Sequence, residues 1–71
     1  MDNYEWADAY KKFGKYTVTV EIEGSTGYSR ADVNKANGDQ VTLEIADNHL
    51  DFEISPALYL KMTDWAYANG W

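Results

Sequence analysis

The chain has no cysteine, one proline and one histidine among its 71 residues. Without cysteine it can form neither disulfides nor a thiolate metal site, and this composition favours the cytoplasm. No apolar run approaches the roughly 20 residues of a membrane-spanning helix, and Met1 to Glu5 carry acids where a signal peptide carries bases. We therefore expect residues 1–71 to form one soluble cytoplasmic domain, since so short a chain has room for a single core.

Patterns that carry catalysis or bind cofactors are also missing. No glycine-rich phosphate loop follows a predicted strand, and no serine is set beside the histidine in a recognisable motif. The run Asp47–Asp51 contains His49 and superficially looks like a ligand cluster, but it lacks the glycine and distal glutamate of a calcium loop. We therefore expect no enzyme activity, no cofactor and no metal site.

Acidic and aromatic residues are what the chain has in excess. Twelve carboxylates against six basic side chains give a formal charge of −6, which repels nucleic acids and anionic membranes and attracts basic protein surfaces. Aromatic residues make up 15% of the chain, and each can bury a large area in a small core. The expected partner is a basic protein. The plainer alternative is that the acids only keep a small protein in solution.

Four runs of the chain alternate apolar and polar residues, which is the pattern of half-buried strands. The clearest covers residues 15–23, and the others cover residues 28–35, 41–45 and 50–54. Apolar positions are Tyr16, Val18, Val20 and Ile22 in the first run, Val41, Leu43 and Ile45 in the third, and Leu50, Phe52 and Ile54 in the fourth. We predict four antiparallel strands joined in chain order.

Helices are predicted at both ends of the chain. Over residues 2–13 the larger apolar side chains follow the spacing of one helix face, and Gly14 is suited to end that helix. A second helix is predicted from Pro56 to about Asn69, with Ser55 as its N-cap and proline in its first turn. The face of the first helix consists of Trp6, Ala9, Tyr10 and Phe13.

Turn chemistry sets the registers of the predicted strands. A three-residue loop at 36–38 pairs Val33 with Val41, whereas a two-residue Asn37-Gly38 loop would place Val41 opposite a polar residue. A four-residue loop at 24–27 then brings Val18 opposite Val33, and a two-residue Asp47-Asn48 loop joins the last two strands. The predicted fold is an α+β two-layer sandwich: a helix, a four-stranded antiparallel meander and a helix, with both helices on one sheet face.

The opposite face of this predicted sheet gathers carboxylates around a single arginine, Arg30. Glu44 would lie directly opposite Asp51, a like-charged pair that costs up to about 1 kcal/mol. A face selected only for solubility would mix in lysines, so we predict that these acids bind a partner. The six predicted binding residues are Glu21, Glu23, Asp32, Glu44, Asp51 and Glu53.

In size, charge and order of elements the chain resembles small acidic proteins, many of them phage-encoded, that present carboxylates in place of nucleic-acid phosphates. Some anti-CRISPR inhibitors are of this DNA-mimic type. The resemblance includes no motif and transfers no residue. It implies a non-enzymatic inhibitor, monomer or homodimer, that engages a basic, nucleic-acid-handling protein in the host cytoplasm.

An alternative function rests on aromatic residues that have no evident place in the core. Tyr59 and Tyr67 lie in the predicted C-terminal helix, and Trp71 follows it. Surplus aromatics of this kind are enriched at protein interfaces. The chain would then be a small structural or assembly protein that self-associates or binds a partner through this helix. A small-molecule or immunity-type binding module is neither supported nor excluded.

Overall fold

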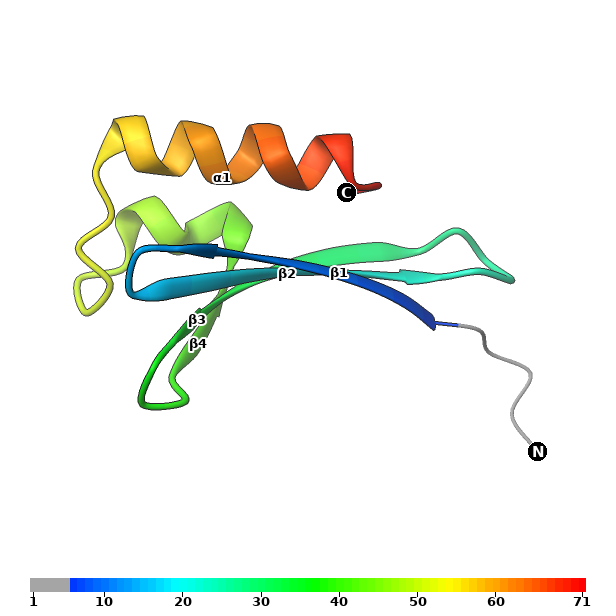
Figure 1. Ribbon diagram of the computed structural model, residues 1–71, viewed down its shortest axis with the longest axis horizontal. Helices are drawn as coiled ribbons and strands as arrows, with labels where there is room; N and C mark the ends of the chain where they lie inside the picture. The colour runs from blue at the N-terminus through cyan, green and yellow to red at the C-terminus, as the bar shows by residue number, and fades with distance from the viewer. Residues whose placement is uncertain (1–5) are drawn as a thin grey trace.

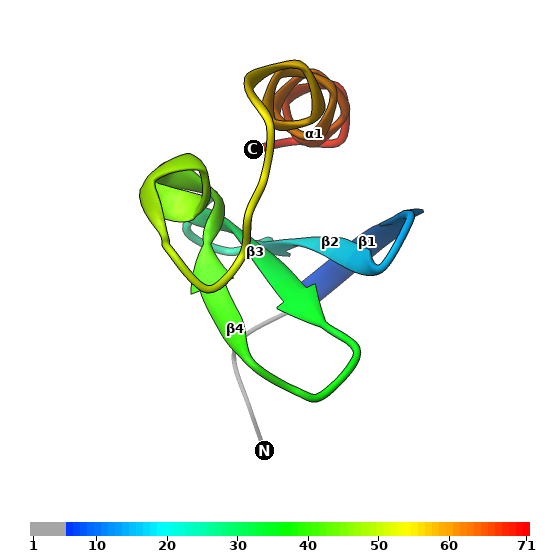
Figure 2. The same ribbon diagram turned by 90° about the vertical axis from the view of Figure 1, so that its left-hand side faces the viewer.

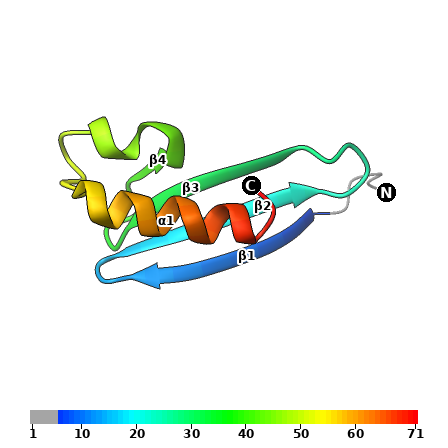
Figure 3. The same cartoon turned by 90° about the horizontal axis from the view of Figure 1, so that it is seen from above.

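The computed structural model describes the backbone of residues 6–71 and the side chains of residues 8–71. A four-stranded antiparallel sheet, in the order β1-β2-β3-β4, is followed by a short 3-10 helix and one α-helix. Both helices lie on the same side of the sheet (Figures 1 and 3). The α+β class and the antiparallel sheet are confirmed. The elements are β1 (Trp6–Phe13), β2 (Tyr16–Glu23), β3 (Ser29–Lys35), β4 (Gln40–Thr42), η1 (Leu43–Asn48) and α1 (Pro56–Ala68).

The predicted N-terminal helix is wrong where the structure describes it. Residues 6–13 form β1, which pairs along its whole length with β2, from Trp6 opposite Glu23 to Phe13 opposite Tyr16. Gly14 lies in the two-residue turn between these strands and ends no helix. The cause is tertiary: β2 offers these residues a complete ladder of backbone partners, which overrides their helical spacing. Residues 2–5 of the predicted helix lie outside the described residues.

The predicted registers on either side of β3 are confirmed. Val18 lies opposite Val33, and Val33 lies opposite Val41. The loop at 36–38 has three residues, and the Gly38 N–H donates to the Lys35 carbonyl oxygen at 3.0 Å. In the four-residue loop at 24–27, the Glu23 N–H donates to the Tyr28 carbonyl oxygen at 2.8 Å. Local turn chemistry and burial of valines therefore favour the same pairing.

The predicted third strand is too long and the predicted fourth strand is wrong. Pairing stops at Thr42, and the chain continues as η1 and then as irregular turns up to Ser55. In η1 the buried residues Leu43 and Ala46 are three positions apart, which matches the 3-10 period. This path buries Phe52 and leaves Leu50 92% exposed, whereas a strand pairing would have set Leu50 against Ile45.

Helix α1 begins and ends as predicted. The Leu58 N–H donates to Ser55 Oγ at 3.1 Å, and Pro56 occupies the first turn. At the other end the Trp71 N–H donates to the Ala66 carbonyl oxygen at 3.0 Å and Gly70 has a φ of +105°, the bonding of a Schellman cap. The buried core consists of Tyr16, Val18, Val20, Ala31, Val33, Leu43, Ala46, Phe52, Ile54, Met62 and Ala66.

Replacing Gly70 by alanine should lower the free energy of unfolding by more than the same change at Gly38. Both glycines have positive φ, +105° and +98°, so each variant carries a left-handed penalty of about 1–2 kcal/mol. A Cβ at Gly70 would also overlap Ile22 Cδ1, whereas a Cβ at Gly38 meets open space. The end of the Ile22 side chain must turn aside, which adds up to about 1 kcal/mol. Urea unfolding measures both losses, and equal losses would show that Gly70 does not pack against β2.

Candidate functional site

One face of the sheet is covered by α1 and η1, and within the described residues no helix lies on the other (Figures 1 and 2). We call this second side the open face. Cross-strand pairing places Asp8, Glu21 and Arg30 in one row of it and brings Asp32 beside Thr19 in the next row. Three predicted binding residues belong to the open face: Glu21, Glu23 and Asp32.

Two of these three carboxylates are held by Arg30. The Arg30 Nη2 atom lies 2.9 Å from Glu21 Oε1, and its Nε atom lies 3.6 Å from Asp32 Oδ2. Asp32 is buried, and burial raises the pKa of its carboxyl group, with Glu21 adding to the rise and Arg30 opposing it. Arg30 therefore offsets one of these two negative charges, and both carboxylates are engaged within the chain.

Glu23, the third carboxylate, closes the loop between β2 and β3. Its carboxylate accepts hydrogen bonds from the Ser25 hydroxyl at 2.6 and 2.7 Å and from the backbone N–H of Thr26 at 2.6 Å. These bonds lower the pKa of Glu23 to about 2, and the bond from the Ser25 hydroxyl has the largest effect. Only 2% of the residue is exposed. Glu23 is thus a structural group of the loop and offers little surface to a partner.

The other three predicted residues lie together in sequence but outside the sheet. We define residues 44–53, which comprise most of η1 and the turns after it, as the acidic segment. Its carboxylates are all exposed, and it contains no lysine or arginine. Glu44 and Asp51 do not face each other across a hairpin as predicted, because no strand forms here. The carboxylates of the acidic segment are Glu44, Asp47, Asp51 and Glu53.

The acidic segment is attached to the sheet by Phe52 and Lys35. The Phe52 ring is buried and stacks on Tyr16, with centroids 5.9 Å apart. Lys35 Nζ donates to the Asp51 carbonyl oxygen at 3.0 Å and lies 5.5 Å from the centre of the Phe52 ring. Both contacts use the backbone or the apolar side of the segment, so its four carboxylates stay in solvent.

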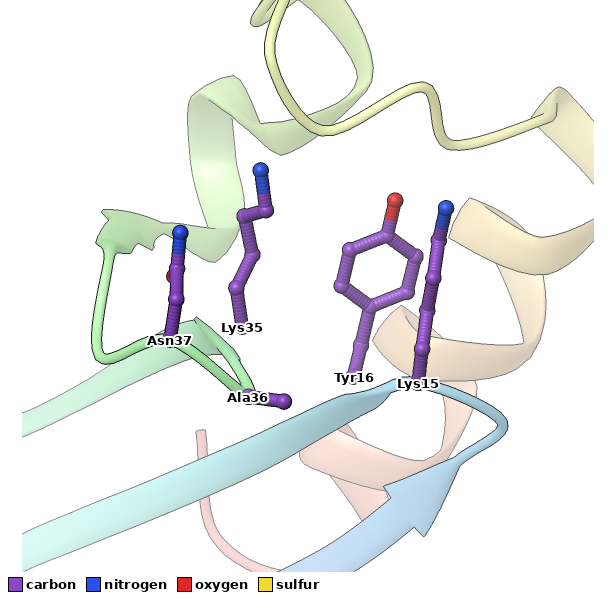
Figure 4. Close-up of a pocket in the computed structure, with 5 residues that line it drawn as sticks. All are labelled: Lys15, Tyr16, Lys35, Ala36 and Asn37. Carbon is purple, nitrogen blue, oxygen red and sulfur yellow. The ribbon is translucent and has the colours of Figure 1, made fainter.

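A small cavity of about 220 Å³ lies next to this attachment. Its lining comes from the two hairpin turns, and the Tyr16 ring stands between Lys15 and Lys35, with the hydroxyl and both amines at the same end (Figure 4). Lys15 Nζ lies 5.5 Å from the Tyr16 ring centre, so each amine already contacts an aromatic ring. The two lysines make the lining of this cavity basic, and one of them, Lys35, supports the acidic segment. The remaining lining residues are Ala36 and Asn37.

Two further features of the acidic segment concern His49 and Glu53. The His49 ring meets the Phe52 ring edge-on at 5.2 Å, and within the described residues its buried Nδ1 atom has no hydrogen-bond partner. No group of three potential metal ligands occurs in the part of the chain that the structure describes. Glu53 has a φ of +51°, a left-handed conformation that a side chain adopts at a cost of about 1 kcal/mol or more.

Sequence reasoning missed four residues that the structure brings into these surfaces. Asp8 and Tyr10 lie on the open face because residues 6–13 are a strand, and Asp47 and Leu50 are exposed because residues 43–54 are not a hairpin. No regular alternation marked the first pair, because Lys11 shares a side of the strand with Ala9 and Phe13. No pattern in the sequence distinguished the second pair from an ordinary tight turn.

Comparisons with known proteins found no relative of this chain. No family model matches it, and no similar curated protein or solved structure was found. Among residues 6–71, every helix is too short or too polar to cross a membrane. The functional argument therefore rests on the geometry of the acidic segment and of the open face.

Glu23→Gln and Asp32→Asn should change stability in opposite directions at pH 7. The pKa of Glu23 in the fold, about 2, lies below its ordinary 4.5, so its charge stabilises the fold above pH 4.5 and this contribution is lost as pH falls toward 2. The pKa of Asp32 is raised, so its charge opposes folding at neutral pH and the Asn variant should be more stable there. Urea unfolding from pH 7 to pH 3 measures both, and a destabilised Asp32→Asn would contradict the burial argument.

Lys35→Met should loosen the acidic segment while preserving the sheet. The variant keeps the apolar stem but loses the bond to the Asp51 carbonyl and the contact with the Phe52 ring, together worth about 1–2 kcal/mol. Hydrogen exchange at the Phe52 amide, which is bonded to the His49 carbonyl oxygen, should accelerate. Lys61→Met, an exposed change on α1, is the matched control, and equal protection in both variants would show that Lys35 does not hold the segment.

Proposed function

We propose that the chain is a non-enzymatic acidic binding protein that engages a basic surface of a partner protein through the acidic segment. The observation that supports this is the exposure of Glu44, Asp47, Asp51 and Glu53 in one short stretch. Among residues 6–71 none of the four forms an ion pair. Carboxylates that lack an internal cation are available to an external one, and a concentration of them attracts basic surfaces over a distance.

The open face is the weaker binding surface of the two. Glu21 and Asp32 are already close to Arg30, and Glu23 is bonded to its own loop. A partner that used these groups would have to replace bonds that already exist within the chain, so they attract it less than carboxylates without an internal cation do. We therefore retain Glu44, Asp51 and Glu53 from the predicted binding residues and add Asp47.

Apolar side chains in the acidic segment supply a second kind of contact. Leu50 is 92% exposed and Ile45 is 50% exposed, although both are large and apolar. An apolar residue at the centre of a charged patch can act as an anchor, while the surrounding charges guide the partner into register. The bond from Lys35 and the burial of Phe52 hold this irregular stretch against the sheet, and such preorganisation lowers the entropy cost of binding.

We infer the class of partner from the charge of the segment. Proteins that handle nucleic acids bind phosphates through clustered lysine and arginine side chains. A run of exposed carboxylates competes with phosphates for these lysine and arginine side chains. We therefore propose that the chain inhibits a cytoplasmic nucleic-acid-handling protein by occupying its basic surface. Binding through these contacts should weaken as salt concentration rises.

A second candidate function is supported by the outer side of α1. Leu60 and Tyr67 are 60% and 65% exposed and lie two helical turns apart. Trp71 stacks on Tyr67 at a centroid distance of 4.7 Å, which extends this apolar stripe beyond the helix. Tyr59 contributes less, because it is partly buried and its hydroxyl donates to the Glu44 carbonyl oxygen at 3.4 Å. A structural or assembly partner could dock on Leu60, Tyr67 and Trp71.

Charge reversal in the acidic segment should abolish partner binding. We would compare the wild type with Glu44→Lys/Asp51→Lys and with the control Asp39→Lys/Asp64→Lys, which changes the net charge equally at exposed sites outside the segment. Each protein is immobilised, and retention of purified basic nucleic-acid-binding proteins from the host is measured at about 50 mM and about 500 mM salt. Wild type and control should retain one at low salt only. Equal losses in both variants would indicate non-specific attraction, and no loss in either would refute a role for the segment.

A further inference from the structure

Strand β1 is a long strand at the edge of the sheet. It has eight residues, contains neither proline nor glycine, and pairs without interruption with β2 alone. The opposite edge, β4, has three residues and runs directly into η1. Long regular edge strands offer unpaired backbone groups to another strand, and proteins usually blunt them with lysines, prolines or bulges. Of these, β1 has lysines alone, Lys11 and Lys12. Among the described strands, β1 is therefore the one suited to further pairing.

The turn at 14–15 determines which backbone groups of β1 face outward. In a two-residue hairpin the closing pair, here Phe13 and Tyr16, exchanges both of its hydrogen bonds. Alternate residues along β1 then point toward β2, and those between them point outward. The outward N–H and C=O groups belong to Asp8, Tyr10 and Lys12. The side chains of the same three residues are exposed, Tyr10 by 76%.

We propose that β1 pairs antiparallel with β1 of a second copy of the chain, about a twofold axis that passes through Tyr10. In this register each Asp8 lies opposite Lys12 of the other copy, and the two Tyr10 residues face each other. Both copies then contribute their sheets to one continuous eight-stranded sheet. This inference does not depend on the proposed function of the acidic segment.

Geometry and charge together select this register. Antiparallel partners must both point outward, so the pairing can shift only by an even number of residues. One such shift places Lys11 opposite Lys11, which is repulsive, and the other leaves Asp8 opposite Tyr10 without a cation. The register centred on Tyr10 alone forms two opposite-charge pairs, and within the described residues neither Asp8 nor Lys12 has another ion pair.

Charge at this edge differs from charge over the rest of the chain. The chain as a whole carries −6, so two copies repel each other at most of their surfaces. Residues 6–15 hold three lysines against a single carboxylate, Asp8, so two β1 edges also repel each other unless the register pairs their charges. The two Asp8–Lys12 pairs of the register centred on Tyr10 offset this repulsion. The axis at Tyr10 also keeps Lys11 opposite Ala9 of the other copy.

Exchanging the charges of Asp8 and Lys12 by substitution tests both the dimer and its register. Sedimentation equilibrium of the wild type should show a monomer–dimer equilibrium. Asp8→Lys alone and Lys12→Asp alone each create two like-charged pairs and should raise the dissociation constant about tenfold or more. The double variant Asp8→Lys/Lys12→Asp restores both pairs and should recover wild-type association. A wild type that stays monomeric up to about 1 mM, or a double variant no better than the singles, overturns the proposal.

A backbone variant separates strand pairing from side-chain contact. Tyr10→Pro removes an outward N–H and leaves the ladder to β2 intact, as proline is tolerated at such positions of an edge strand. It should dissociate the dimer more than Tyr10→Ala does, and circular dichroism with urea unfolding verifies that both variants fold. Leu60→Glu/Tyr67→Glu should leave the dimer unchanged. Dissociation by this α1 variant would instead assign the dimer to the helix and overturn pairing through β1.

Discussion

The contact between Phe52 and Tyr16 is the interaction on which the rest of the structure depends. Phe52 lies in a stretch without regular backbone pairing, yet 1% of it is exposed and its ring stacks on Tyr16 of β2 at 5.9 Å. This contact draws residues 43–54 over the core and places Ser55 where α1 can begin. Helix α1 then covers β2 with Met62 and Ala66. A sheet with one α-helix could not otherwise close its core.

The same contact explains why the carboxylates divide into two groups. In the sheet, cross-strand neighbours are about 5 Å apart, so Glu21 and Asp32 share Arg30, which offsets one of their two charges. In the acidic segment, Phe52 uses the apolar side of the chain, and the acids between the buried residues turn to solvent. Charge that is available to a partner is therefore concentrated in the irregular part of the fold, where the backbone is held by Lys35 and by few bonds of its own.

The topology also separates the acidic segment from the edge formed by β1. The acidic segment follows β4 at one edge of the sheet, and β1 forms the other edge. Pairing through β1 would leave the acidic segments of two copies on the two separate halves of an eight-stranded sheet. Each could then engage a basic surface independently, and a partner with repeated basic sites would be bound more tightly by two linked segments than by one.

Local chemistry in the sequence determined the hairpins around β3 and the ends of α1. Gly38, Ser55 and Gly70 each satisfy a requirement of a few neighbouring residues, so their roles can be read without knowledge of the whole fold. Residues 6–13 and 43–54 were different, because their apolar spacing indicated a helix and two strands, whereas they form a strand and an irregular segment. Only tertiary structure decided them: β2 supplied a ladder for the first, and burial of Phe52 against Tyr16 selected the second. The candidate site changed with them, since the direction of an exposed acid depends on which neighbour is buried.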